Sequence, residues 1–522
     1  MIHQFNYGID QLTVAKALDI AAGCLRGVII PEVAARIAAS RAYVQEIVAK
    51  HSTVYGINTG FGPLCDTKIS EEDTRTLQYN ILQSHSVGVG NPIPVTVARV
   101  MLITKVHALA QGYSGVAPAT LDRIIWHIEH NVTPVVPEKG SVGASGDLAP
   151  LSHLFLPLIG LGEVWYKGQR VHASAMMQAE GLDPIILGPK EGLALINGTQ
   201  FILSFAVTAL QRFHNLLEAA DIIGALSLEG LMGTARPFDP RLHAIRPYPG
   251  SQLVAHRLKM MLENSGIMAA HVDCDRVQDP YSLRCMPQVH GASRTAWLHL
   301  LDLTTIELNS VTDNPIIFSA EDTISGGNFH GQPLAIPLDY ATVAAAELGN
   351  ISDRRCYMMI EGRYGLPKLL IENAGLNSGF MIPQYTTAAL VTENKTLCFP
   401  ASADSVPTSL GQEDHVSMGS ISGRKLHQVI DNLEYILAIE LLYAAQAVDF
   451  RRPLTSGPVL ETVHSFVRET VSFATKDRIF AYDIQHLHTL ITNQSLVNVA
   501  NKAAADNQLS LNGIYHDQFG LY

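Results

Sequence analysis

Four long segments rich in alanine and leucine most constrain how this chain can fold. Their apolar residues extend nearly all round a helical wheel, and a helix that is apolar on every side must be buried among other helices. Several such helices predict a long bundle, completed by neighbouring copies of the chain. The segments are residues 201–232, 294–311, 339–362 and 429–450.

The first 200 residues differ in character from these segments. Residues 32–50 have apolar positions at helical spacing and predict a helix, and a short strand is expected near residues 11–14. Between about 60 and 190, frequent glycine and proline indicate loops and short elements around a site. Because strand-like alternation is sparse, we expect a mainly α fold: a long central helical bundle with a loop-rich N-terminal region. The expected domains are residues 1–200, the central bundle 201–450 and a C-terminal helical region 451–522.

The charge balance and the cysteines narrow the class of protein. A formal net charge of −12 argues against a nucleic-acid partner, which needs a basic face. The longest apolar runs are too short to span a bilayer, and the first residues lack the pattern of a signal peptide. Six scattered cysteines without a C-x-x-C pair are typical of reduced thiols. We therefore expect a cytoplasmic protein that binds neither nucleic acid nor membrane.

The run "GSVGASGDLAP" (140–150) places Ala144, Ser145 and Gly146 among glycines, ahead of an apolar segment. It lacks the lysine of a phosphate loop, and its second glycine comes one residue too early for a hydrolase nucleophile elbow. In a tight bend, the Gly146 nitrogen can instead reach the Ala144 carbonyl carbon, because glycine leaves that approach unhindered. Closure of this five-membered ring loses one water, and loss of the Ser145 hydroxyl as a second water leaves an electrophilic methylidene-imidazolone.

The residues after this run predict a short helix. Asp147 stands at its expected start, Pro150 falls in its first turn, where a missing N–H is harmless, and Pro157 should kink or end it. Such a helix directs its positive end at the ring and stabilises negative charge that develops there.

The run 140–154 resembles the signature of the ammonia-lyases and aminomutases that build a methylidene-imidazolone from Ala-Ser-Gly. Further blocks of that family follow in order over most of residues 50–450. The resemblance implies a carbon–nitrogen lyase that eliminates ammonia from an amino acid and needs no metal or dissociable cofactor. It also implies a homotetramer with active sites built from more than one subunit. The matching blocks are "YGINTGFG" (55–62), "SHSVGVG" (84–90), "KEGLALINGTQ" (190–200), "CDRVQDPYSLRC" (274–285), "ELNSVTDNPIIF" (307–318), "SGGNFHGQP" (325–333), "LNSGFM" (376–381) and "QEDHVSM" (412–418).

The resemblance also assigns roles within these blocks. Tyr55 would take the β-proton of the substrate, and its ordinary pKa near 10 would have to be depressed for that role. Arg284 would hold the substrate carboxylate through a bidentate pair, and Phe329 would pack near the ring. The residues that would orient the amine, the carboxylate and the ring oxygen are Asn197, Gln278, Tyr281 and Asn328.

Two residues bear on the choice of substrate. Glu413 precedes Asp414 in a block where tyrosine and phenylalanine members of the family commonly carry Asn-Gln-Asp, whereas histidine-directed members carry glutamate before the aspartate. A carboxylate suits an imidazole N–H and is disfavoured against a benzene ring, and His85 would supply a second polar partner. We therefore expect L-histidine as the substrate and trans-urocanate as the product, in the first step of histidine degradation. A tyrosine or phenylalanine lyase, or an aminomutase, stays the alternative.

Two functions from other classes fit the sequence less well. A catalytically silent helical scaffold is disfavoured because Tyr55, Ser145 and Arg284 are all present. A zinc enzyme is disfavoured because His486 and His488 lie two apart in an expected helix and face different sides.

Overall fold

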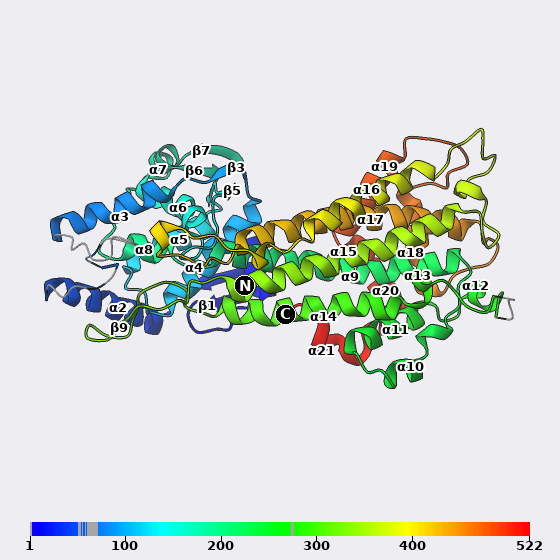
Figure 1. Cartoon of the computed structure of the whole chain (residues 1–522), viewed down its shortest axis with the longest axis horizontal. Helices are drawn as coiled ribbons and strands as arrows, with labels where there is room; N and C mark the ends of the chain where they lie inside the picture. Colours follow the sequence, from blue (N-terminus) through cyan, green and yellow to red (C-terminus); the bar gives the residue numbers. More distant parts are fainter. Residues whose placement is uncertain (1–2, 51–53, 55, 58, 60–70, 273–275) are drawn as a thin grey trace.

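The computed structural model describes residues 3–50, 54, 56, 57, 59, 71–272 and 276–522. The chain forms a long helical bundle with a smaller region of shorter helices and strands at one end, at the left of Figure 1. The fold is mainly α, as the sequence predicts. The helices are α1 (Val14–Ala22), α2 (Pro31–Ala49), α3 (Glu71–His85), α4 (Val95–Ala110), α5 (Pro118–Glu129), α6 (Leu148–Phe155), α7 (Ala173–Glu180), α8 (Glu191–Ile196), α9 (Gln200–Gly230), α10 (Pro240–Ala244), α11 (Pro249–Met261), α12 (Gly266–Ala269), α13 (Tyr281–Arg284), α14 (Met286–Leu308), α15 (Gln332–Ile360), α16 (Met381–Leu397), α17 (Gly419–Asp449), α18 (Pro458–Thr470), α19 (Phe480–Thr492), α20 (Ser495–Asp506) and α21 (His516–Phe519).

The bundle is built on α9, α14, α15 and α17, which cover most of the four segments singled out in the sequence. Nearly every residue of α9 and of the C-terminal half of α17 is buried, so these helices are enclosed on all sides. Each helix begins before the segment that predicts it and ends slightly before the end of that segment; α14, for example, begins eight residues earlier, at Met286. The described residues include no helix that is long and apolar enough to cross a membrane.

Short strands accompany the helices of the smaller region. β1 and β2 are parallel, β3 and β5 are antiparallel, β6 joins β4 to β7, and β8 pairs with β9. The strand expected near residues 11–14 is wrong: the Thr13 hydroxyl caps the Lys16 amide, so Val14 begins α1. The strands are β1 (His3–Asn6), β2 (Leu25–Val28), β3 (Val89–Pro92), β4 (Thr133–Pro134), β5 (Pro137–Lys139), β6 (Glu163–Tyr166), β7 (Gln169–His172), β8 (Ile316–Ile317) and β9 (Thr323–Ile324).

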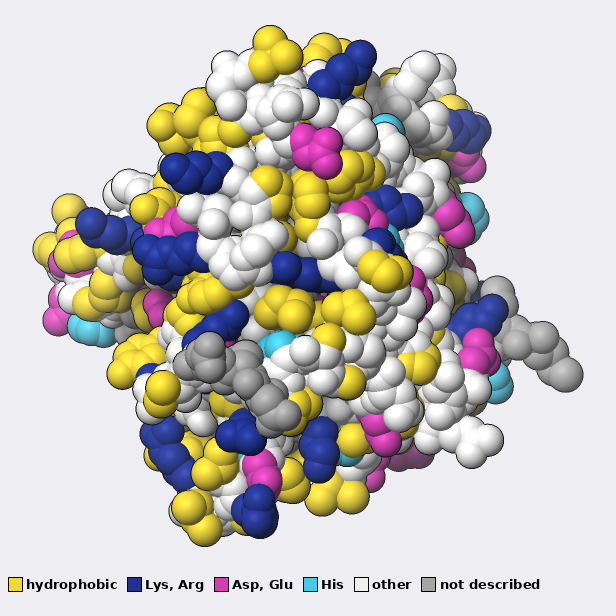
Figure 2. Space-filling view, turned by 90° about the vertical axis from the view of Figure 1, so that its right-hand side faces the viewer, with side chains coloured by type: hydrophobic (Ala, Val, Ile, Leu, Met, Phe, Trp, Pro, Cys, Tyr) yellow, Lys and Arg dark blue, Asp and Glu magenta, His cyan; other side chains and the backbone are white. Residues whose placement is uncertain are grey.

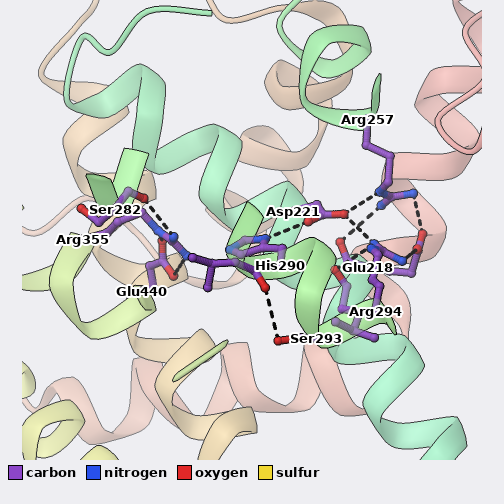
Figure 3. A network of polar contacts seen from close by, with 11 residues as sticks. Glu218, Asp221, Arg257, Ser282, His290, Ser293, Arg294, Arg355 and Glu440 are labelled. Atoms are coloured by element: carbon purple, nitrogen blue, oxygen red, sulfur yellow. Dashed lines mark hydrogen bonds and ion pairs between the residues drawn. The ribbon is translucent and has the colours of Figure 1, made fainter. Parts of the chain in front are cut away.

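A buried ionic network crosses the bundle (Figure 3). Arg257 and Arg294, from α11 and α14, both pair with Glu218 and Asp221 of α9, at 2.5–3.0 Å. His290 of α14 contacts the same Asp221 at 2.8 Å. Such fully enclosed pairs are costly to break, because the remaining partner is left as an uncompensated buried charge. The network therefore fixes the register of α9 against its neighbours.

The expected domain boundaries coincide with helix ends. α9 begins at Gln200 and α17 ends at Asp449. The division into residues 1–200, 201–450 and 451–522 itself stays a prediction.

Candidate active site

Ala144, Ser145 and Gly146 form a tight turn between β5 and α6. Ser145 and Gly146 both have left-handed backbone conformations, with φ of 50° and 77°. A Cβ atom added to Gly146 would lie 2.2 Å from the carbonyl oxygen of Gly198, so only glycine fits there. The turn is closed by the Asp147 amide, which donates to the same carbonyl at 2.8 Å.

Asp147 joins this turn to the N-terminus of α9. As expected, it is the N-cap residue of α6, but its carboxylate does not cap that helix. The carboxylate instead accepts hydrogen bonds from the amides of Phe201 and Ile202, at 3.1 and 3.0 Å. Burial raises the pKa of Asp147 to about 7, although these hydrogen bonds oppose the rise. The turn is therefore held by one of the longest helices of the molecule.

Asn197 lies directly beside the turn. Its side-chain Nδ2 donates to the backbone carbonyl of Ser145 at 2.7 Å. Its Oδ1 is buried and has no hydrogen-bond partner among the described residues. Asn197 thus presents one unsatisfied acceptor at the site, and a buried acceptor of this kind gains free energy when it finds a donor.

Two neighbouring buried lysines, Lys105 and Lys190, were not predicted from the sequence. Lys105 donates to the Asn197 carbonyl at 2.6 Å, and Lys190 pairs with Asp313 at 2.8 Å. Burial, together with the nearby charge of Lys190, lowers the pKa of Lys105 to about 7, although the carboxylates of Asp313 and Asp147 oppose the change. The available signal was a lone lysine inside the apolar run "VMLITKVHALA" (100–110), which cannot say what the lysine contacts.

Glu413 faces the turn from the segment before α17. The Ser145 hydroxyl donates to its Oε1 at 2.5 Å. The other carboxylate oxygen accepts from the hydroxyls of Ser409 and Thr408, and the Thr408 amide donates to the Glu413 carbonyl at 2.8 Å. These bonds fix a half-buried carboxylate within hydrogen-bond reach of residue 145.

His85 ends α3 on the same side of the site. The ring is half-buried, and its Nδ1 lies 3.0 Å from the Ser84 hydroxyl. Burial lowers the pKa of His85, and the nearby Glu413 carboxylate opposes that change. The structure therefore brings together three predicted positions, His85, Ser145 and Glu413, from distant parts of the sequence.

Asn328 and Phe329 lie in the loop before α15. Asn328 is exposed and donates to the Val311 carbonyl at 3.2 Å, and Phe329 is half-buried. The next residue, His330, stacks on His415 with ring centroids 5.5 Å apart. This loop therefore lies against the segment that carries Glu413.

Gln278, Tyr281 and Arg284 lie elsewhere in the chain, toward the right-hand end of the bundle in Figure 1. Gln278 and Tyr281 are exposed, and the Arg284 guanidinium lies 4.6 Å from the centroid of the Tyr281 ring. The Arg284 Nε is buried and lacks a hydrogen-bond partner in the described part of the chain. Figure 2 views this end, where Lys, Arg and hydrophobic side chains are interspersed.

The distance between the residues around Ser145 and those around Arg284 follows from the length of α15. Its N-terminus at Gln332 follows the loop of Asn328, whereas Arg355 donates to the Ser282 carbonyl of α13 (Figure 3). Those two points are roughly 23 residues apart, or about 35 Å at the helical rise of 1.5 Å per residue. Within one chain, Arg284 therefore does not reach Ser145.

Tyr55 and the histidine pair of α19 complete the positions predicted from the sequence. Tyr55 lies outside the described residues. His486 and His488 lie in α19, where His488 stacks on Tyr435 and approaches Glu434 at 3.4 Å. Among the described residues, no three His, Cys, Asp or Glu side chains are grouped so that they could hold a metal ion.

Both the sequence and the fold of this chain match those of a known protein family. Residues 12–469 match the family model described as aromatic amino acid lyase. A histidine ammonia-lyase of Sorangium cellulosum is 48% identical over 503 residues, covering 94% of this chain and 98% of the relative. Among solved structures, a histidine ammonia-lyase from Trypanosoma cruzi superposes with a TM-score of 0.90 at 39% identity, covering 100% of this chain and 98% of the other. A tyrosine aminomutase from Streptomyces globisporus also gives 0.90, at 34% identity over 97% of this chain and 99% of the other.

Proposed function

The chain belongs to the aromatic amino acid lyase family, and we propose that it eliminates ammonia from L-histidine to give trans-urocanate. It is a carbon–nitrogen lyase. The observation that carries the choice of substrate is the contact between the Ser145 hydroxyl and the Glu413 carboxylate. A fixed carboxylate at this point pairs with an imidazole N–H, whereas a plain phenyl ring would leave it unsatisfied.

Members of this family use a methylidene-imidazolone, and we propose that Ala144, Ser145 and Gly146 form one here. The residues present fit the group. Gly146 has no side chain to obstruct closure, Ser145 and Gly146 already have the left-handed conformations of a tight bend, and the Asn197 Oδ1 lacks a partner beside the turn among the described residues. When formed, the group supplies an electrophile that turns the substrate amine into a better leaving group.

The residues around the turn have separate roles in this proposal. Glu413 accepts the imidazole N–H and orients the ring of the substrate, with His85 as the second polar partner. Asn197 fixes the carbonyl of residue 145 through its 2.7 Å hydrogen bond. Tyr55, assigned from its sequence block alone, is the expected base for the β-proton, and Phe329 packs beside the site.

Arg284 binds the substrate carboxylate in this proposal, together with Gln278, Tyr281 and Asn328. Because Arg284 and Ser145 lie far apart in space within one copy of the chain, a complete site needs Arg284 from a second copy. An exposed apolar row on α15 supports such an assembly: Ile336, Tyr340 and Val343 recur at helical spacing on one face. We propose a homotetramer, as the family resemblance implies, and a cytoplasmic location.

A second candidate is tyrosine-directed elimination or amine migration, because the tyrosine aminomutase superposes as well as the histidine ammonia-lyase does. The fold therefore does not choose between them, and Glu413 favours histidine. The test offers purified protein L-histidine, L-tyrosine and L-phenylalanine separately and follows the near-ultraviolet absorbance of the unsaturated acids. Turnover of histidine alone is expected; turnover of tyrosine without histidine would favour the second candidate.

A further inference from the structure

A cavity of about 450 Å³ lies apart from the Ser145 site, between the β1–β2 pair and helices α1, α4 and α5. Its volume is within the range of small-molecule sites. The wall is largely apolar, with Ile20, Leu25, Ile125 and Ile128 among its residues, and the polar groups include Arg99 and Tyr7. None of these residues belongs to the proposed reaction.

Arg99 brings a positive charge to this cavity, and it has no acidic partner among the described residues. Its side chain is only 7% exposed, and its Nε and Nη2 donate to the carbonyls of Ala21 and Ile128, at 2.7 and 3.2 Å. No carboxylate pairs with it, and its Nη1 has no acceptor, within the part of the chain that the structure describes. The nearest acid on the rim, Glu129, is held by the Arg26 Nε at 2.7 Å. A buried, unpaired guanidinium of this kind is costly unless an anion joins it.

Tyr7 adds a second unsatisfied donor. Its side chain is 1% exposed, and its hydroxyl has no hydrogen-bond partner among the described residues. The absence of a side chain on Gly27 makes room for the ring, because a Cβ there would lie 2.2 Å from a Tyr7 ring carbon. Burial raises the pKa of Tyr7 well above its ordinary value, and Glu129 raises it as well, so the hydroxyl keeps its proton. The Tyr7 hydroxyl is therefore a hydrogen-bond donor that has no acceptor among the described residues.

We propose that this cavity binds a small organic monocarboxylate with a compact apolar or aromatic body. One carboxylate oxygen accepts from the Tyr7 hydroxyl and the other from the Arg99 guanidinium, while the body packs against the isoleucine and leucine side chains. A carboxylate fits better than a phosphate, because Arg26 is already paired with Glu129, which leaves the Arg99 guanidinium and the Tyr7 hydroxyl to hold the anion beside the apolar side chains.

The test is calorimetric titration of the full-length protein with benzoate as the probe. We expect saturable binding to the wild type and at least about 10-fold weaker binding to Tyr7→Phe, which loses one hydrogen bond to a charged group. Tyr7→Phe removes an unpaired hydroxyl, so its melting temperature and its turnover of histidine should stay unchanged. Benzyl alcohol, which has the same body without the charge, should not bind.

Arg284→Met separates this cavity from the active site, where a carboxylate could also bind. That variant should keep the Tyr7-dependent binding of benzoate, whether or not the proposed reaction is right. Equal affinity of the wild type and Tyr7→Phe, loss of binding in Arg284→Met, or inorganic phosphate binding as tightly as benzoate would each overturn the proposal.

Discussion

The Ser145 hydroxyl donates a 2.5 Å hydrogen bond to the Glu413 carboxylate, although the residues are 268 positions apart in the chain. The contact joins two functions that the sequence predicts separately. Ser145 is the proposed source of the electrophile, and Glu413 is the proposed selector of the imidazole. Their proximity places the ring of a bound histidine beside the group that receives its amine.

Replacing Glu413 by glutamine tests this selection. The Glu413→Gln side chain keeps its size but loses the charge, so kcat/KM for histidine should fall by about 10- to 100-fold, as for a lost hydrogen bond to a charged group. The intact mass should still show the loss of two waters. Asp414→Asn, at the exposed neighbouring position, is the matched control and should behave as the wild type. An unchanged kcat/KM in Glu413→Gln would remove Glu413 from substrate recognition.

Gly146→Ala tests the geometry of the turn. The new Cβ would lie 2.2 Å from the Gly198 carbonyl oxygen, so the backbone must shift and the ring should not close. Mass spectrometry should find the unmodified chain, and the histidine assay should find no activity. Gly181→Ala is the control, because Gly181 also has a positive φ, of 65°, but open space around it. A modified and active Gly146→Ala would contradict the account of the turn.

Mixing two inactive variants tests whether copies share a site. Ser145→Ala lacks the electrophile, and Arg284→Met lacks the carboxylate clamp, so each alone should be inactive. Co-expressed and assembled at random, they should regain about a quarter of the wild-type activity, because a site is then intact when each of two chains supplies its unaltered residue. A chain that carries both changes, mixed with Ser145→Ala, is the control. Inactivity of verified mixed oligomers would show that one chain supplies both residues.

Asp147→Asn tests the buried carboxylate through the pH dependence of stability. The folded-state pKa of Asp147 is raised from 3.8 to about 7, so its contribution to stability is full below 3.8 and is lost as the pH rises toward 7. Asparagine can accept the same backbone hydrogen bonds and does not titrate. In a Ser145→Ala background, the free energy of unfolding of Asp147→Asn minus that of the parent should therefore increase by about 3 kcal/mol from pH 5 to pH 8.

Denaturant unfolding at several pH values measures this difference, and groups common to both proteins cancel. A difference that stays constant with pH would mean that the Asp147 carboxylate is ionised throughout.

The helices were the most predictable part of the fold. Segments such as 201–232 are apolar on every side, and burial within a bundle is the available solution for such a surface. The expected strand near residues 11–14 failed because a threonine cap and the helical spacing after it outweighed a short apolar run. Local competition of this kind is decided by single hydrogen bonds, which a sequence does not display.

The candidate site was predictable residue by residue but not as an arrangement. The conformation of Gly146 follows from the need for a bend, yet the approach of Gly198 that makes glycine obligatory depends on tertiary packing. In the sequence, Lys105 can be recognised only as a lone charged residue within an apolar helix. The distance of Arg284 from Ser145 could not be read from motif order, because the blocks that form one site need not come from one copy of the chain.

The intact mass of freshly purified, histidine-degrading protein tests the central claim most directly. If residues 144–146 close their own backbone into the electrophile, the mature chain is two water molecules lighter than its translated sequence, and Ser145→Ala abolishes both this difference and the release of urocanate. A fully active preparation whose mass equals that of the translated sequence would contradict the account.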